Sequence, residues 1–460
     1  MQKLLLKKIS WLITMDDMDN IYKDIDLLIE DNKIKAIKKN IDDININEGN
    51  GDKIINCSGL VVLPGFVNTH HHLYQTMFRG IKEVQNMPLF PWLKGLYEFW
   101  KRVDSEVVYY GAMVGFSELL RTGCTTTMDH HYVFPKKSKG NLIDEEIKAA
   151  KEIGIRFHAA RGSMSLGKEQ GGLPPRSIIQ SEEEILLDSE RLIDKYHDFR
   201  DFAMTRIVLA PCSPFSTTNN VMWETKELAR KKAVMLHTHL CETVDEENFC
   251  KEKYEKTPVE LMKELEWVGK DVWFAHGIYI SEKEMKTIGG AGIAHCPSSN
   301  MKLGSGICKT SELLNAGIPV GIAVDGSASN DGSNMWEEVK RAYLLNHLKY
   351  GDQGLTAYEI LKMATAGGAK VLGRKDIGVL EPNKAADIIA IDLNDIAFAG
   401  CHDPVISIVC CGNSSHVKYT IVNGKVVVKD GIILSVDIGE IGIKADKLAK
   451  DIVDKERRKE

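Results

Sequence analysis

The stretch "LPGFVNTHHH", residues 63–72, is a short apolar run that leads directly into three consecutive histidines. A run of this length and composition predicts a buried β-strand. Residues i and i+2 of a strand point to the same side, so His70 and His72 can both reach one metal ion, whereas His71 points the other way and is expected to pack. The stretch therefore predicts a strand that ends in metal ligands, with a chance surface cluster as the alternative.

Short apolar strands that end in polar residues recur along the middle of the chain. Seven further strand ends are expected at "GCTTTMDHH", "IRFHAARG", "TRIVLAPCS", "AVMLHTHL", "DVWFAHG", "GIAHCP" and "IPVGIAVDG". Amphipathic segments between them predict helices over residues 104–122, 141–153, 181–197, 219–231, 256–266, 281–289, 309–316 and 334–350. Eight strand–helix units in this order predict an α/β fold, a closed (β/α)8 TIM barrel.

The two ends of the chain have a different pattern. Residues 3–60 alternate apolar and polar side chains, and the alternation returns in "ADIIAIDLN" and "KYTIVNGKVVVKDGIIL". We expect residues 1–60 and 380–460 to form one composite β-sandwich and residues 61–379 to form the barrel. The charged segment 443–460 predicts a solvated helix, with an oligomer contact as the alternative.

Composition excludes several classes of protein. The chain has 460 residues and a net charge of −6, which argues against binding to nucleic acid or to an anionic membrane. The N-terminal apolar run is broken by Lys7 and Lys8 and does not fit a signal peptide. Ten cysteines without a CxxC pair indicate neither a disulfide framework nor a cysteine zinc site. We expect a cytoplasmic homo-oligomer that acts on a small molecule, without a nucleic-acid or membrane partner.

Ionisable side chains gather at the predicted strand ends. They are His70, His72, His239, His276, His295 and Asp325. In a TIM barrel this rim carries the active site, so the set predicts a metal centre rather than separate core residues. Three histidines, a carboxylate and a water suit Zn²⁺, and Fe²⁺ is the alternative because imidazole does not choose sharply between these ions.

Five motifs resemble those of the amidohydrolase superfamily, and within it the deaminase branch that includes guanine deaminase, 8-oxoguanine deaminase and the triazine hydrolases. They are "LPGFVNTHHH", "HTHLCET", "WFAHG", "AHCPSSNMKLGSGI" and "GIAVDGSASND". The resemblance covers nearly the whole chain. It implies that one metal ion is bound by His70, His72, His239 and Asp325. Two-metal members carry a lysine at the end of the fourth strand, and "MTRIVLAPCS" has none.

The resemblance also implies catalytic roles. Glu242 would be the proton shuttle, His276 would polarise the reacting centre, and Asp325 would be both ligand and proton acceptor. Without the resemblance, Glu242 would be read as an exposed carboxylate at a helix start and His276 as a core histidine; His295 is expected at most to line the pocket. The signatures of the cytidine-type deaminases and of the HExxH metallopeptidases are absent from the sequence.

The substrate is expected to be a purine-like heterocycle. By resemblance Gln75 would hydrogen-bond its ring and Arg161 a ring carbonyl oxygen, although a structural ion pair is the alternative for Arg161. The Gly-rich segment 162–175 is expected to act as a lid. We expect deamination of 8-oxoguanine to urate, with guanine, isoxanthopterin, isocytosine or a hydroxytriazine as alternative substrates. A catalytically silent scaffold of the same fold is the alternative from another class.

Overall fold

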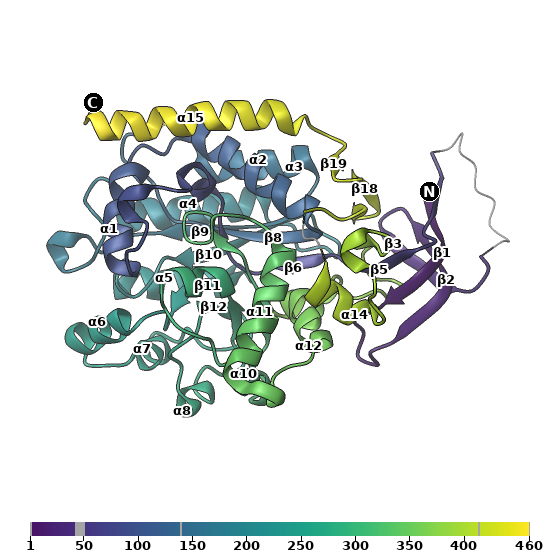
Figure 1. Ribbon diagram of the computed structural model, residues 1–460. Helices are drawn as coiled ribbons and strands as arrows, with labels where there is room; N and C mark the ends of the chain where they lie inside the picture. The colour runs from purple at the N-terminus through teal and green to yellow at the C-terminus, as the bar shows by residue number, and fades with distance from the viewer. Residues whose placement is uncertain (1, 42–50, 139, 413–414, 460) are drawn as a thin grey trace.

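The computed structural model describes residues 2–41, 51–138, 140–412 and 415–459. Its centre is a sheet of eight parallel strands in the order β14-β13-β12-β11-β10-β9-β8-β6 (Figure 1). These are β6 (Phe66–Asn68), β8 (Cys124–His131), β9 (Arg156–Ser163), β10 (Thr205–Pro211), β11 (Met235–Leu240), β12 (Val272–His276), β13 (Gly292–His295) and β14 (Val320–Ile322). The predicted TIM barrel and its eight strands are confirmed.

The barrel closes between its first and last strands. The backbone N–H of Thr69 donates to the carbonyl of Ile322 at 3.3 Å. Just beyond, β7 (His71–His72) pairs in parallel with β15 (Asp325–Gly326). Closure thus places the histidine stretch beside the aspartate of the last strand.

Helices cover the outside of the barrel. The eight predicted ones are present as α2 (Ser105–Arg121), α3 (Leu142–Ile153), α4 (Glu182–Tyr196), α5 (Asn219–Lys231), α7 (Pro258–Glu264), α8 (Glu282–Met285), α10 (Thr310–Asn315) and α11 (Met335–Tyr350). Side-chain caps explain where several of them begin, because a Ser, Thr, Asp or Asn oxygen accepts an otherwise unpaired N–H of the first turn. Such caps are Asp104, Ser181, Thr218, Thr257, Ser281 and Asn334.

Further helices were not expected from the sequence: α1 (Leu89–Trp100), α6 (Val244–Tyr254), α9 (Pro297–Lys302), α12 (Ala357–Lys362), α13 (Gly368–Val371) and α14 (Pro404–Ile406). The 3₁₀ helix η2 (Leu73–Phe78) follows the histidine stretch. The two longest of these helices show why the sequence pattern did not predict them. α1 contains both Pro91 and Gly95, which lower helix propensity, and α6 is polar on nearly all sides.

The strands of the two chain ends pair in one nine-stranded sheet. They are β1 (Lys3–Ile13), β2 (Ile21–Glu30), β3 (Lys33–Lys38), β4 (Lys53–Asn56), β5 (Leu60–Pro64), β16 (Ile388–Asp392), β17 (Tyr419–Val422), β18 (Lys425–Lys429) and β19 (Ile432–Ile433). Antiparallel pairing of β5 with β16 joins the N-terminal to the C-terminal strands. The composite β-unit is thereby confirmed; its boundaries at 60 and 380 stay a prediction, and residues 42–50 of its range lie outside the described residues.

The C-terminal helix α15 (Ile438–Arg458) packs along α2 on the outside of the barrel (Figure 1). Ala445, Ile452 and Val453 are buried on its inner face. Arg102 Nε lies 3.0 Å from Glu456 Oε2, and this ion pair binds the C-terminal end of α15 to the barrel domain. The expectation of a solvated helix is therefore wrong: apolar side chains at helical spacing form a stripe among the charges. No helix in the described part of the chain is long and apolar enough to cross a membrane.

A buried ion pair ties the barrel to the terminal sheet. Arg156 at the start of β9 binds both carboxylate oxygens of Asp387, with Nε–Oδ2 at 2.8 Å and Nη2–Oδ1 at 3.0 Å. Its Nη1 donates to the carbonyls of Phe202 and Ala203, each at 2.7 Å. The N–H of Asn423 donates to Asp387 Oδ1 at 2.7 Å. Both charges are thus fully hydrogen-bonded although they lie inside the protein.

Arg156→Leu is expected to lower the free energy of unfolding by about 3–5 kcal/mol, because it leaves Asp387 buried without its cation. Urea unfolding curves of the variant and the wild type measure this difference. The control is Arg200→Leu, whose side chain is 86% exposed and pairs with Asp198 on the surface, where no measurable change in the unfolding midpoint is expected. Equal midpoints for the two variants would contradict the role of the buried pair.

Candidate metal and substrate site

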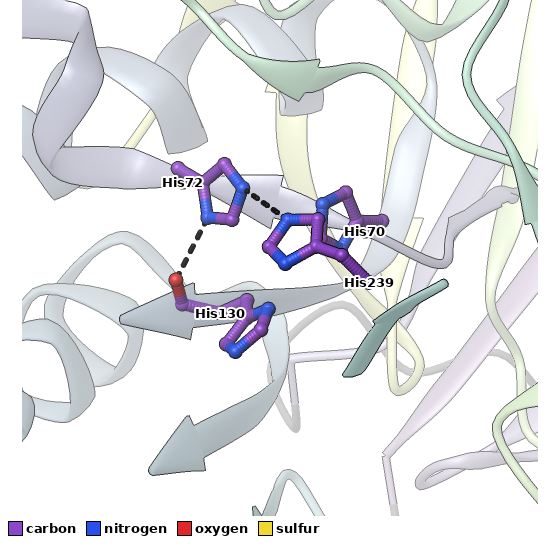
Figure 2. A group of neighbouring side chains, drawn as sticks. All are labelled: His70, His72, His130 and His239. Atoms are coloured by element: carbon purple, nitrogen blue, oxygen red, sulfur yellow. Dashed lines mark hydrogen bonds between the residues drawn. The ribbon is translucent and has the colours of Figure 1, made fainter. Parts of the chain in front are cut away.

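The predicted ligands come together at the carboxyl end of the barrel. His72 Nε2 lies 3.1 Å from His239 Nε2. The Nε2 atoms of His70 and His72 each lie 3.4 Å from Asp325 Oδ1. Figure 2 shows the rings of His70, His72 and His239 turned toward one another, with His130 beside them. The barrel strands thus bring all four predicted ligands into one buried cluster.

Hydrogen bonds behind the cluster fix the tautomers of two rings. His72 Nδ1 lies 2.8 Å from the carbonyl of His130, and His239 Nδ1 lies 2.6 Å from the carbonyl of Cys212. A carbonyl oxygen only accepts, so both Nδ1 atoms carry the hydrogen and both Nε2 atoms present a lone pair. Two lone pairs facing each other at 3.1 Å are not a hydrogen bond. A cation between them satisfies both.

The third ring is oriented through a second histidine. His70 Nδ1 lies 2.8 Å from His237 Nε2, and His237 Nδ1 lies 3.0 Å from the carbonyl of Trp273. The terminal carbonyl sets the direction of the chain: His237 donates to Trp273, and His70 donates to His237. His70 Nε2 is left as a buried lone pair without a hydrogen-bond partner among the described residues. Three such nitrogens and one carboxylate fit a divalent metal ion.

His237 was not identified from the sequence. The signal was available in "HTH", residues 237–239, because it repeats the i, i+2 spacing of His70 and His72 on another inward-facing strand. His130 was also missed; its ring stacks on that of His239, with centroids 4.8 Å apart. His71 packs away from the cluster, with Nε2 3.0 Å from Ser333 Oγ.

The predicted acid–base groups lie next to the predicted ligands. His276 Nε2 is 3.5 Å from Glu242 Oε2 and 3.9 Å from Asp325 Oδ2, and its Nδ1 is 2.9 Å from Asn300 Oδ1. Ser305 Oγ donates to Glu242 Oε1 at 3.4 Å. Burial raises the pKa of Glu242 to about 6. This carboxyl group can therefore both hold and release a proton near neutral pH.

Backbone conformation aims two of these side chains. His276 has φ 73° and Asp325 has φ 62°, both in the left-handed region that non-glycine residues seldom adopt. His276 is the last residue of β12, and Asp325 is the first residue of β15, three residues after β14 ends. Local strain of this kind is found where the surrounding structure holds a side chain in a functional position.

A cavity lies above the cluster. Its floor includes His72, His239, Glu242, His276 and Asp325. Its apolar walls are formed by Leu89, Trp92 and Leu93 of α1 together with Phe215 and Leu303. No lysine or arginine is among the described residues that line it. The cavity is thus shaped for a small uncharged ligand.

Of the two predicted substrate contacts, only Gln75 lines the cavity. Arg161 lies outside it: Nε binds Asp188 Oδ2 at 3.0 Å and Nη1 binds Gln180 Oε1 at 2.9 Å. Ala160 packs in the barrel interior, so its neighbour Arg161 points outward toward α4. The expected contact of Arg161 with a ring oxygen is corrected to a structural ion pair. His295 does not line the cavity either.

The loop after β9 lies beside the cavity wall. The N–H of Leu173 donates to the carbonyl of Phe215 at 3.3 Å, and the N–H of Leu166 donates to that of Ser216 at 3.0 Å. The predicted lid segment 162–175 is therefore in contact with the wall residue Phe215. Its movement stays a prediction.

His237→Phe is expected to weaken Zn²⁺ binding by about 10–100-fold, because His70 loses the acceptor that fixes its tautomer. His237→Gln, whose amide oxygen can accept the same hydrogen bond, is expected to retain more of the affinity. Competition with a chromophoric chelator measures the dissociation constants. His347→Phe on α11 is the control, and wild-type affinity in His237→Phe would contradict the orienting role.

Comparisons with known proteins agree with this geometry. A model of the amidohydrolase family matches residues 61–427. The chain is 47% identical over 383 residues to 8-oxoguanine deaminase of Pseudomonas aeruginosa, which covers 83% of this chain and 85% of that protein. It is 34% identical over 454 residues to hydroxydechloroatrazine ethylaminohydrolase of Pseudomonas sp. strain ADP, covering 96% and 94%. A solved structure of atrazine chlorohydrolase from Arthrobacter aurescens TC1 complexed with zinc superposes with a TM-score of 0.91 at 32% identity, covering 97% of this chain and 100% of that one. The chain therefore belongs to the amidohydrolase family.

Proposed function

We propose that this protein is a metal-dependent hydrolytic deaminase that converts 8-oxoguanine and water to urate and ammonia. The observation that carries the proposal is the convergence of the lone pairs of His70, His72 and His239 with Asp325 and Glu242 at one cavity. The 47% identity to an 8-oxoguanine deaminase supports the choice of substrate.

The lining of the cavity supports a free base as the substrate. A phosphate or carboxylate bound away from the metal ligands would have to leave water without a cationic side chain to meet it, because the described lining holds no lysine or arginine. Trp92, Phe215 and the leucines offer apolar surface to a flat ring. Gln75, 1% exposed, presents an amide that can pair with donors and acceptors on the ring edge.

Zn²⁺ is the ion that we infer for the centre, with Fe²⁺ as the alternative. Three imidazole nitrogens and one carboxylate are a common zinc donor set, and the related atrazine chlorohydrolase was solved with zinc. When bound, the ion would supply Lewis-acid chemistry that makes water acidic near neutral pH.

The residues of this chain divide the proton transfers between them. Asp325 accepts a proton from the attacking water. Glu242, protonated at the start, delivers its proton to the ring nitrogen beside the reacting carbon. It then takes up the proton of the added hydroxyl group as the carbonyl forms and passes it to the amino group, which leaves as ammonia. The proton held by Asp325 finally returns Glu242 to its starting state. One group can serve both transfers when its pKa is near the working pH, and burial raises the pKa of Glu242 to about 6. His276 hydrogen-bonds the oxygen that adds to the carbon.

A second candidate is a hydrolase that removes an alkylamine from a hydroxytriazine. The 34% identity to hydroxydechloroatrazine ethylaminohydrolase over 96% of this chain favours it. The two reactions differ in the group released, ammonia or an alkylamine, and require the same ligands and the same carboxyl group.

Glu242→Gln is expected to keep the bound metal and to lose turnover by at least about 100-fold, since general acid–base catalysis contributes about 10²–10⁴-fold. Metal content by elemental analysis and kcat by ammonia release measure the two properties. Asp245→Asn, at an exposed position in the first turn of α6, is the matched control. Near wild-type kcat in Glu242→Gln would remove the carboxyl group from the mechanism.

Among 8-oxoguanine, guanine, isoxanthopterin, isocytosine and hydroxyatrazine, we expect 8-oxoguanine to give the highest kcat/KM with the metal-loaded protein. Urate absorbance, ammonia and alkylamine are measured in parallel. A clear preference for another compound would replace the substrate and leave the metal-dependent chemistry in place. Release of neither amine from any compound would contradict the proposed substrate class.

A further inference from the structure

A second cluster of ionisable groups lies behind the metal site and is not used in the proposed mechanism. Asp129 and His131 project from β8 toward α3, which contributes Glu146, and all three residues are 0% exposed. One ligand atom from each lies within 4.8 Å of the others. Two carboxyl groups are therefore enclosed next to one imidazole without contact to water.

Hydrogen-bond donors for this cluster can be assigned from its two ends. His131 Nε2 lies 2.9 Å from the carbonyl of Val133, which only accepts, so Nε2 carries the hydrogen. Burial lowers the pKa of His131 to about 4 and so favours the neutral imidazole, in which Nδ1 is an acceptor, yet Nδ1 lies 2.8 Å from Glu146 Oε1. At the other end, the backbone N–H of Leu73 donates to Asp129 Oδ1.

The carboxyl groups of Asp129 and Glu146 lie close together, with one oxygen of each within 4.8 Å of the other. Asp129 Oδ2 and Glu146 Oε2 have no N–H or O–H partner among the described residues. Pairing Asp129 Oδ2 with Glu146 Oε2, and Glu146 Oε1 with the Nδ1 of a neutral His131, each needs a proton. Supplying both gives a one-way chain from Leu73 N–H through Asp129, Glu146 and His131 to the carbonyl of Val133.

The electrostatics of the cluster also indicate that both carboxyl groups are protonated. Two ionised carboxylates this close together at zero exposure would repel each other and would both lose their hydration. Burial raises the pKa of Asp129 and of Glu146 well above the usual range, and it lowers the pKa of His131 to about 4. The guanidinium of Arg161, the residue paired with His131 on the neighbouring strand, is bound to Asp188 and Gln180 instead.

The hydrogen-bond chain starts at Leu73, in the segment that carries the site. Leu73 directly follows His72 and begins η2, which holds Gln75. His72, at the N-cap position of η2, makes no side-chain cap. The first N–H of this helix is satisfied by Asp129 from outside the barrel. The position of Asp129 therefore sets where both the metal ligand and the cavity-lining glutamine lie.

We propose that Asp129 and Glu146 are both held as neutral carboxylic acids, and that the relay from Leu73 to Val133 which they form with His131 is a positioning unit for the turn from His72 to Gln75. The neutral relay is independent of the proposed function, whereas its effect on substrate binding rests on that function.

Two substitutions of Asp129 test whether the relay needs a hydrogen-bond donor at this position rather than a negative charge. In Asp129→Asn the amide oxygen still accepts from Leu73, and the amide N–H replaces the shared proton as donor to Glu146. Asp129→Leu has a similar size and removes both interactions. Glu145→Gln, on the solvent side of α3 next to Glu146, is the control for changes in charge on that helix.

Infrared difference spectroscopy of wild type minus Asp129→Asn at pH 8 is the first measurement, and it needs no substrate. We expect the difference to contain the carbonyl band of a protonated carboxylic acid, and wild type minus Glu145→Gln to contain none. Loss of carboxylate bands alone in Asp129→Asn would overturn the neutral acid. A second metal equivalent in the wild type that disappears in Asp129→Asn would also overturn it, because a cation would then occupy the cluster.

The positioning role is tested by the Zn²⁺ dissociation constant and by KM. We expect Asp129→Leu to weaken Zn²⁺ binding and to raise KM, each by about tenfold or more, and Asp129→Asn to restore most of both. Wild-type values in Asp129→Leu, or equal losses in the two variants, would overturn the positioning role. If Asp129→Leu does not fold, a Zn²⁺ affinity in Asp129→Asn tenfold or more below that of the wild type overturns it. If the spectra are as expected but the protein acts on none of the heterocycles, the neutral relay stands and only the proposed function is contradicted.

Discussion

The parallel pairing of β7 with β15 is the contact on which the site depends. It joins the first and last strands of the barrel and sets His71 against Asp325 and His72 against Gly326. The N–H of Asp325 donates to the carbonyl of His70 at 3.1 Å, and the N–H of Val324 donates to Asn68 Oδ1 at 3.0 Å. The predicted ligands at the two ends of the barrel sequence are therefore held together by hydrogen bonds that backbone N–H groups donate. Any shift in the register of closure would separate the histidines from the aspartate.

Hydrogen-bond direction is set from behind the site by groups that can only accept. Carbonyl oxygens of His130, Cys212 and Trp273 fix the tautomers of the three ligand histidines, two of them directly and one through His237. The carbonyl of Val133 has the same role for the relay through His131. In a water-free interior each misassigned hydrogen would leave a buried polar atom unpaired, at a cost of about 1–3 kcal/mol. The backbone of the barrel thus determines the protonation pattern of the side chains around its mouth.

Much of this arrangement could be predicted from the sequence because it depends on periodicity and chain order. The i, i+2 spacing of His70 and His72 and the recurrence of strand–helix units are both local patterns. Arg161 shows the limit of such reasoning. It lies at a strand end, as expected, but neighbouring residues of a strand point to opposite faces. The motif does not determine which of the two faces Arg161 occupies. Helix α15 depends on tertiary packing of a thin apolar stripe. The i, i+2 spacing of "HTH" places His237 on the inner face of its strand, but its role depends on an inter-strand contact with His70 that this spacing does not give.

The ligands and acid–base groups of the site come from the barrel, whereas much of the apolar wall comes from α1 and from loops outside the sheet. Chemistry and recognition are thus encoded in separate parts of the chain, and one can change without the other. A substitution in α1 alters the shape offered to a substrate while the strands below it keep their register. This modularity gives a physical reason why relatives named for purines, pterins and triazines share 34–47% of their residues with this chain. New specificities in this framework are therefore open to evolution, or to design, through the wall alone.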